Sequence, residues 1–251
     1  AVGRLGRRSD ADLAWETDLL VYLDRAGLAV PAPIPTTDGR LFAGGVVVMT
    51  YVEGGPPQTE ADWRRVADTF RRLHQLTPGW PQRPGWRSST DLLHTETGTR
   101  VNLGAMPPEG VLRCRAAWTR LVGRQTCVVH GDPNPRNIRI TADRVALIDW
   151  DEAHVDVPDL DLALPHNAAG LNDEAFDRAA QAFAAWEAAV CWDDDHAKRR
   201  LAQLQLLDES LGDLQATVSA RLASGSARPS QALEPEQLRA AVIERQSIAL
   251  Q

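Results

Sequence analysis

The chain has 251 residues, with 27 basic and 34 acidic side chains and a formal net charge of −7. A hydrophobic fraction of 43% and a charged fraction of 24% are those of a globular protein and exclude a disordered or fibrous chain. The lack of an apolar run of about 20 residues argues against a membrane protein, and the acidic balance argues against a nucleic-acid-binding one.

The first elements are predicted from apolar periodicity and from prolines. Apolar residues on neighbouring turns predict a helix over about residues 10–26, which Ser9 or Asp10 can cap. Prolines at alternate positions of 31–35 then force an extended chain. The β-branched run at 46–49 predicts a buried strand.

A Gly-Gly-Pro-Pro sequence at 54–57 ends this strand and marks the predicted division of the chain. We interpret residues 1–54 as the remnant of a small lobe, with a helix and a connecting strand. Residues 55–251 are interpreted as a larger, mainly helical lobe that begins with an amphipathic helix at about 60–76.

Loops and short elements are predicted for the middle of the larger lobe. Residues 77–110 are rich in Pro, Gly, Ser and Thr, which predicts a loop or a substrate-facing insertion, and a helix is expected at 111–123. Three short strands follow, at 126–129, 138–141 and 145–148.

The rest of the chain is predicted to be mostly helical. Apolar stripes at 176–190 and 204–218 have the spacing of buried helix faces and are interpreted as core. The three cysteines are odd in number and form no CxxC pair, which favours reduced thiols in a cytoplasmic protein. The basic N-terminus leads into no apolar stretch, so no signal peptide is predicted.

The densest group of chemically active side chains follows the first of the three strands. That strand ends at His130 and Asp132, and the chain then turns through two prolines to Asn137. The next two strands form a hairpin, which returns the chain to Asp149 beside Asn137, with Asp132 across a tight loop. Two carboxylates and one amide therefore converge in a site that suits Mg²⁺ completed by phosphate and water, whereas soft zinc ligands are absent.

A purely structural interpretation of these residues is also open. His130 and Asp132 could hydrogen-bond a buried turn, and Asn137 could cap the hairpin. The presence of all the polar residues at this spacing, each beside an apolar strand, favours a functional site.

The segment HGDPNPRN, residues 130–137, followed by IDWD at 148–151, resembles the active-site signature of the aminoglycoside phosphotransferase family. Downstream, Pro158 and the Asp-Leu-Ala at 161–163 match a further element of that family, although Val157 replaces its leading Asp. Weaker likenesses come in the right order: a helix Glu, Glu16; a hinge-like segment at 48–54; and Arg-Leu-His at 72–74.

The resemblance implies an α+β, two-lobed protein-kinase-like fold whose small lobe is shortened. It also implies a transferase that moves the γ-phosphate of ATP, with Mg²⁺, to a hydroxyl. In that framework Asp132 is the catalytic carboxylate, and Asn137 and Asp149 hold the metal. His130 has an architectural role, and Asp161 caps the next helix and braces the catalytic loop.

Further roles follow from the same resemblance. Glu16 is the helix carboxylate that pairs with a phosphate-binding cation. The hinge backbone at Thr50, Tyr51 and Val52 binds adenine. Asp151 contacts substrate, supports the metal site, or is simply exposed.

One feature of the chain departs from the family pattern. Kinase-like folds use a strand lysine and a Gly-rich loop to hold phosphates, yet Lys198 is the only lysine among the 27 basic residues and no Gly-rich loop is present. Either those strands lie upstream of Ala1, or an arginine substitutes for the lysine, with Arg4 the best candidate. A merely solvated basic run that includes Arg4, Arg7 and Arg8 is the other interpretation.

The acceptor is the least constrained part of the prediction. Acidic and aromatic side chains are adjacent at two places: Glu187 follows Trp186, and Trp192 precedes a run of aspartates. Such pairs suit a cationic acceptor, for example an aminoglycoside-like antibiotic. A solvated helix face with its own charge pairs is the alternative. A metabolic kinase for a sugar, choline or homoserine-like acceptor, a degenerate nucleotide- or ligand-binding protein without transfer, and a magnesium-dependent phosphohydrolase also remain open.

Overall fold

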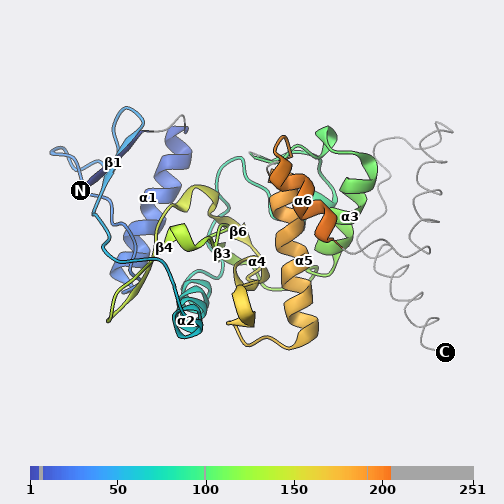
Figure 1. Ribbon diagram of the computed structural model, residues 1–251. Coiled ribbons are helices and arrows are strands. Elements are labelled where there is room, and N and C mark those ends of the chain that lie inside the picture. Colours follow the sequence, from blue (N-terminus) through green and yellow to red (C-terminus); the bar gives the residue numbers. More distant parts are fainter. Residues whose placement is uncertain (6–7, 99, 191, 205–251) are drawn as a thin grey trace. The chain divides into compact units, whose positions relative to one another are not determined.

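The structure, a computed structural model, describes residues 1–5, 8–98, 100–190 and 192–204 (Figure 1). Its N-terminal part contains two short strands with a helix between them in the chain. Strand β1 (Val2–Leu5), which the sequence did not predict, runs antiparallel to β2 (Val46–Met49). The strand predicted at 46–49 is confirmed, but it is not buried throughout. Val47 and Met49 are buried whereas Val48 is exposed, because one face of a two-stranded antiparallel ribbon can remain in solvent.

Helices α1 (Asp10–Arg25) and α2 (Glu60–Leu76) begin at side-chain caps, which confirms both predicted helices. The Ser9 side chain accepts an N–H from the first turn of α1, and Thr59 forms a reciprocal capping box with Asp62 in α2. Each helix buries its predicted apolar face. The buried side chains of these faces include Leu13, Leu20, Leu23, Trp63, Val66, Phe70 and Leu73.

The segment after α2 is mostly irregular, as predicted, and contains the short 3-10 turns η1 (Asp91–Leu93) and η2 (Leu103–Ala105). Helix α3 (Pro108–Thr119) follows it. This helix starts and ends earlier than the predicted 111–123. A proline is tolerated in the first turn of a helix, where its missing N–H would have no partner, so the helix can begin at Pro108.

The three predicted strands are present as β3 (Cys127–Val129), β4 (Ile138–Ile140) and β5 (Val145–Leu147). Strands β4 and β5 form the predicted antiparallel hairpin. Strand β3 instead pairs with β6 (His154–Asp156), which was not predicted. Strand β6 is short and begins and ends with a polar residue, so it carries no apolar run in the sequence.

The C-terminal described part is helical. It comprises α4 (Asp159–Leu162), the 3-10 turn η5 (Pro165–Asn167), α5 (Asp173–Val190) and α6 (Asp195–Gln203). The stripe predicted at 176–190 is buried only in part, at Ala179 and Trp186, and alanines between 182 and 189 complete the buried face. Of the stripe predicted at 204–218, Leu204 is buried and the rest lies outside the described residues.

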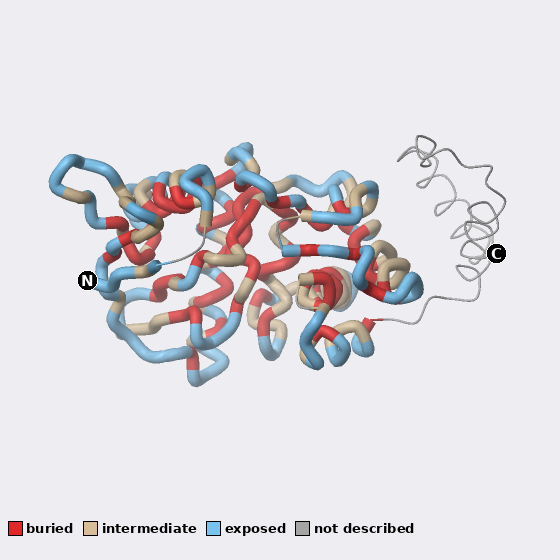
Figure 2. Tube along the Cα trace, turned by 90° about the horizontal axis from the view of Figure 1, so that it is seen from above, coloured by how far each residue is buried: buried red, intermediate tan, exposed pale blue. Residues whose placement is uncertain are grey.

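Two clusters of buried apolar side chains form the core. Figure 2 colours the buried residues red along the chain trace. One cluster joins α1, α2, β2 and β5, and the other joins α3 and α5 to the segment between α2 and α3. Strand β3 contributes Val128 to the first cluster and Val129 to the second, because successive side chains of a strand point to opposite faces. The loop that follows β3 therefore starts where the two clusters meet.

The mixture of helices and small antiparallel sheets confirms the α+β class. By their contacts the described residues belong to one unit, Ala1–Gln205, and the division predicted after residue 54 stays a prediction. Within the described ranges, no helix is both long enough and apolar enough to cross a membrane.

Two buried free thiols, Cys114 and Cys127, lie in this core. Burial raises the pKa of Cys114 to about 12 and also raises the pKa of Cys127. Because the thiolate is the reactive form, we expect neither thiol to react with iodoacetamide at about pH 8 while the protein is folded. Peptide mass spectrometry of labelled protein, with and without denaturant, tests this expectation; equal labelling in both samples would contradict it.

Candidate active site

The loop after β3 packs tightly against the segment that follows β5. Gly131 has φ +78°, and a Cβ at this position would lie 2.5 Å from the carbonyl oxygen of Glu152. Only glycine tolerates both the left-handed backbone and this close approach. The tight packing fixes Asp132, the next residue, beside the 3-10 turn η4 (Trp150–Glu152).

Asp161 braces this loop from α4. Its Oδ2 accepts hydrogen bonds from the backbone N–H of His130 at 2.8 Å and from Nε2 of His74 at 2.9 Å, and its Oδ1 accepts from the backbone N–H of Gly131 at 2.9 Å. The predicted brace is therefore present, but the predicted helix cap is wrong, because Asp161 lies inside α4. Burial alone would raise the pKa of Asp161, yet the hydrogen bonds from His74 and Gly131 and the nearby His130 outweigh it and hold the pKa below its ordinary value.

Asp132 and Asn137 meet across the short loop, as the sequence predicts. Nδ2 of Asn137 donates to Oδ2 of Asp132 at 2.7 Å and to its backbone carbonyl at 3.3 Å. The 3-10 turn η3 (Pro135–Asn137) closes the loop. The side-chain oxygen of Asn134 accepts a hydrogen bond from the backbone N–H of Arg136 in this turn. The amide nitrogen of Asn137 is thus engaged with Asp132, which leaves its Oδ1 as an acceptor.

The β4–β5 hairpin brings Asp149 back to Asn137. The backbone N–H of Ile148 donates to the carbonyl of Asn137 at 2.8 Å, so Asp149 follows directly on a residue bonded to Asn137. Asp149 has φ 63°, a left-handed conformation that is unfavourable for a non-glycine residue and must be held by its surroundings. The amide of Asn137 therefore contacts the Asp132 carboxylate, and the hairpin places the backbone of Asp149 next to Asn137.

His130 has the contacts of an architectural residue. Its side chain is buried, and Nε2 donates to the carbonyl of Ile148 at 3.0 Å. Its ring packs against Trp150 with centroids 5.0 Å apart and against Phe70 with centroids 6.2 Å apart. These contacts tie the loop after β3 to the hairpin that carries Asp149.

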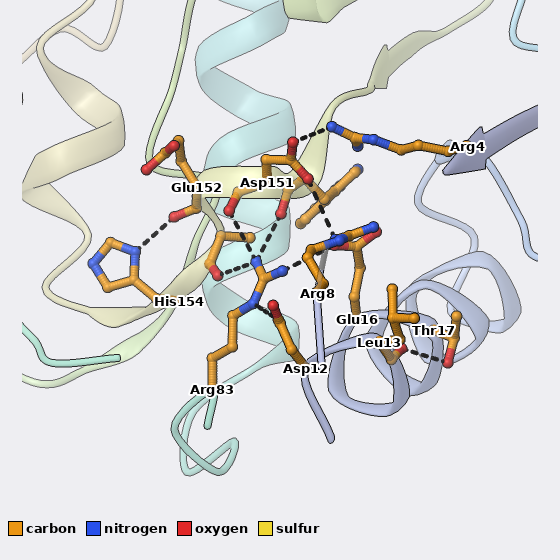
Figure 3. A network of polar contacts seen from close by, with 12 residues as sticks. Arg4, Arg8, Asp12, Leu13, Glu16, Thr17, Arg83, Asp151, Glu152 and His154 are labelled. Atoms are coloured by element: carbon orange, nitrogen blue, oxygen red, sulfur yellow. Dashed lines mark hydrogen bonds and ion pairs between the residues drawn. The ribbon is translucent and has the colours of Figure 1, made fainter. Parts of the chain in front are cut away.

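A cluster of charges lies between the N-terminal segment and η4 (Figure 3). Arg4 donates to Oδ1 of Asp149 at 2.8 Å and also pairs with Asp151. Arg8 pairs with Glu16 and lies 3.3 Å from Oδ1 of Asp151. Arg4 therefore reaches the predicted metal carboxylate directly, while Arg8 is a cation that pairs with Glu16.

Glu16 is buried in α1 and held between two guanidinium groups. Besides Arg8, it accepts from Nη2 of Arg83 at 3.1 Å. Burial raises the pKa of the Glu16 carboxyl, and the charges of Arg8 and Arg83 oppose that rise. The interpretation of Arg8 as a merely solvated residue is therefore wrong, because its side chain is part-buried against Glu16.

The predicted hinge lies between β2 and Gly54. The backbone N–H of Thr50 donates to the carbonyl of Ala32 at 2.9 Å, so this N–H already has a partner within the protein. Tyr51 is exposed and Val52 half-buried, and neither residue has a backbone hydrogen bond within the described chain. Gly54 has φ 131°, and a Cβ there would lie 2.8 Å from a backbone oxygen of β4, so the connector runs closely along that strand.

The residues predicted to bind the acceptor have partners of their own. Glu187 in α5 pairs with Nε2 of His196 at 3.1 Å and with Nε of Arg200 at 2.6 Å, both on α6. Trp192 is partly buried against the second core cluster. The charge of Glu187 is therefore offset by α6, as in the alternative of a helix face with its own charge pairs.

Arg83 and Glu152 were not singled out in the sequence, although both lie in the site region. Arg83 is buried beneath η4. The one feature of the sequence that could have indicated this burial is its position between two tryptophans, Trp80 and Trp86. Glu152 pairs with Arg100 at 3.0 Å. Burial raises the pKa of Glu152, against the effect of Arg100.

The donors at the candidate metal site are hard oxygens. Asp149 offers a half-exposed carboxylate, and Asn137 offers Oδ1. Among the residues that the structure describes, no three His, Cys, Asp or Glu side chains converge on a metal position. A cation here would need oxygens from a ligand and from water, which is how Mg²⁺ binds with phosphates. The residues fit a magnesium ion shared with a nucleotide.

Comparison with known proteins places these observations in a family. An uncharacterized protein of Deinococcus radiodurans is 28% identical over 206 residues, which cover 76% of this chain and 54% of that protein. The chain thus spans about half the length of this curated relative.

Solved structures share the fold. Choline kinase LicA from Streptococcus pneumoniae matches with a TM-score of 0.52 at 14% identity, over 80% of this chain and 83% of that one. The streptomycin–ATP–APH(2″)-IIa ternary complex matches with a TM-score of 0.51 at 14% identity, over 81% and 85%. Both likenesses are of fold alone, and they confirm the protein-kinase-like architecture. Since the model of the phosphotransferase enzyme family (APH) matches residues 1–202, the chain belongs to that family.

Proposed function

We propose that the protein is an ATP-dependent O-phosphotransferase that moves the γ-phosphate to a hydroxyl of a small molecule. The observation that carries the proposal is the convergence of Asp132, Asn137 and Asp149 in a loop and hairpin braced by Asp161. Family membership supports the reaction class, and ATP is the nucleotide bound in the APH(2″)-IIa complex.

In the proposed reaction Asp132 accepts a hydrogen bond from the acceptor hydroxyl and orients its oxygen toward the γ-phosphorus. The new O–P bond forms as the bond to the ADP oxygen breaks, and the acceptor proton passes to Asp132. Magnesium, held by Asn137 and Asp149, would neutralise charge on the phosphates. Arg4 would contact the same phosphates, because its guanidinium already lies at Asp149.

For the acceptor we propose a small alcohol that carries a cationic nitrogen, either a protonated amine or a quaternary ammonium group. The net charge of −7 favours a cationic ligand, and streptomycin and choline belong to the names of two proteins of the same fold. An antibiotic, with resistance as the outcome, and a choline-like metabolite are both within this class. Glu187 is paired with α6 and Glu152 with Arg100, so we assign neither carboxylate to the cationic group of the acceptor. We place the reaction in the cytoplasm, where the buried thiols stay reduced.

A degenerate nucleotide-binding protein without transfer is the second candidate. The ion pair of Arg4 with Asp149, the candidate metal carboxylate, favours it. This alternative predicts that ATP binds without Mg²⁺ or that no phosphate is transferred to any acceptor.

Thermal unfolding with ATP, with and without Mg²⁺, tests the nucleotide part of the proposal. At about 100 times Kd, Mg·ATP should stabilise the protein by about 2.7 kcal/mol, and Asp149→Asn should remove the magnesium-dependent part. Asp143→Asn, in the exposed turn of the β4–β5 hairpin, is the matched control and should behave as the unmodified protein. Equal stabilisation with and without Mg²⁺ would support the degenerate alternative.

A further inference from the structure

Arg83 lies in the irregular segment after α2 and contacts several polar groups (Figure 3). Its guanidinium is wholly buried. A buried guanidinium is tolerated only when its donors find acceptors, because it has lost its hydration. The structure surrounds this one with two carboxylates, three peptide carbonyls and two indole rings. The acceptors belong to two different parts of the candidate site.

The first group of acceptors is the backbone of η4 and the residue after it. Nη1 of Arg83 donates to the carbonyls of Trp150 at 2.9 Å, Asp151 at 3.2 Å and Ala153 at 2.8 Å. Carbonyls at the end of a helical turn lack partners within the turn, and the guanidinium supplies donors for them. The turn begins directly after Asp149, whose left-handed backbone must be held by its surroundings.

The second group of acceptors is on α1. Nη2 donates to Oε2 of Glu16 at 3.1 Å, and Nε donates to Oδ1 of Asp12. These two carboxylates are four residues apart and therefore lie on the same face of the helix. The rings of Trp15 and Trp86 lie 5.3 and 5.2 Å from the guanidinium carbon, within the range of cation–π attraction.

The backbone around Arg83 is itself anchored. The side chain of Gln82 exchanges two hydrogen bonds with the peptide of Val155 in β6, at 2.8 and 2.9 Å. Nε1 of Trp15 donates to the carbonyl of Pro81 at 2.7 Å. The guanidinium is thus presented from a fixed segment and contacts α1 and η4 at the same time.

We infer that Arg83 is a positioning residue that couples helix α1 to the turn carrying Asp149. The position of Glu16 and the geometry of the candidate metal carboxylate then change together. The consequence for the metal rests on the proposed function, whereas the coupling of the two segments is a property of the fold itself.

The variant Arg83→Lys tests this coupling while keeping the charge. An ammonium group has three donors at one point and cannot replace five donors in a planar fork that faces two elements. Arg115→Lys is the matched control, because Arg115 also donates to carbonyls at a 3-10 turn, those of Leu92 at 3.1 Å and Thr95 at 3.2 Å. Asp12→Asn removes the charge of one of the two carboxylates on α1 that face Arg83 and provides a milder second variant if Arg83→Lys does not fold.

Hydrogen exchange followed by mass spectrometry measures the coupling. We expect Arg83→Lys to speed exchange by about tenfold in both 10–16 and 150–153. Asp12→Asn should change the same two segments by a smaller factor. Arg115→Lys should leave both segments unchanged and act around η1. Faster exchange in only one of the two segments, or in neither, would overturn the coupling.

Binding of Mg·ATP, measured by calorimetry, provides the second readout. Loss of groups that orient a metal ligand costs about 10- to 100-fold in metal affinity, so Arg83→Lys should weaken binding by about tenfold with Mg²⁺ and far less without it. An affinity unchanged by Arg83→Lys would overturn the effect on the metal carboxylate. If the unmodified protein binds no Mg·ATP, the proposed function fails, and the exchange experiment alone then decides the coupling.

Discussion

Replacing Asp132 with asparagine is expected to lower kcat for phosphoryl transfer by about 100- to 10,000-fold, the range that a positioned acid–base group supplies. An asparagine can still accept the hydrogen bond that Asn137 donates at 2.7 Å, so the loop and the metal donors should keep their geometry. We therefore expect the KM for ATP to stay nearly unchanged, because the lost interaction acts in the transition state. Steady-state ADP release with an acceptor identified by screening measures both constants.

The matched control for this variant is Asp143→Asn. It makes the same chemical change at an exposed position of the β4–β5 hairpin turn and should leave kcat unaltered. If Asp132→Asn turned over the acceptor at the rate of the unmodified protein, the catalytic role of Asp132 would be wrong. If it lost ATP binding as well, Asp132 would act on the nucleotide instead of the acceptor.

Replacing Asp161 with asparagine is expected to lower the free energy of unfolding by about 1–3 kcal/mol, the cost of leaving buried hydrogen-bond donors without a partner. The carboxylate accepts hydrogen bonds from His130, Gly131 and His74. The Nδ2 group of an asparagine is a donor and would face another donor. Urea unfolding measures the change, and Asp68→Asn is the control, because its exposed ion pair with Arg71 should contribute less than about 1 kcal/mol.

The effect of Asp161 should depend on pH. Its pKa in the folded protein lies below the ordinary value, so it stabilises the fold above the pKa of the unfolded chain, about 3.9. That stability is lost as the pH falls through the lower, folded-state pKa. The difference in the free energy of unfolding between the unmodified protein and Asp161→Asn should therefore be largest near neutral pH and shrink in acid below about pH 4. A difference that is independent of pH would contradict the role of the ionised carboxylate.

Local patterns predicted much of the fold. The helices at 10–25 and 60–76 follow from apolar periodicity, and the first also from its Ser9 cap, which acts within one turn of chain. The convergence of Asp132 with Asn137 was predictable for a similar reason, because five residues of a proline-containing loop leave the two side chains little freedom to separate.

The contacts that the sequence could not predict join distant residues. The partners of Arg83 in η4 and at the residue after it lie 67 to 70 positions away, and only packing of the complete core places them together. Glu187 looked available to an acceptor because nothing local showed that α6 folds back to offset its charge. The pairing of Glu16 with Arg8 depends similarly on where the chain before α1 lies.

Formation of a phosphorylated alcohol tests the central claim most directly. Purified protein would be incubated with Mg·ATP and a panel of amine-bearing antibiotics and small alcohols, with ADP release and ³¹P NMR as readouts. We predict magnesium-dependent ADP release for a few amine-bearing alcohols, with a new phosphate-ester signal that Asp132→Asn forms about 100-fold or more slowly. Binding of Mg·ATP without an ester from any acceptor, or release of phosphate from a phosphoester in the absence of nucleotide, would contradict the proposed transferase.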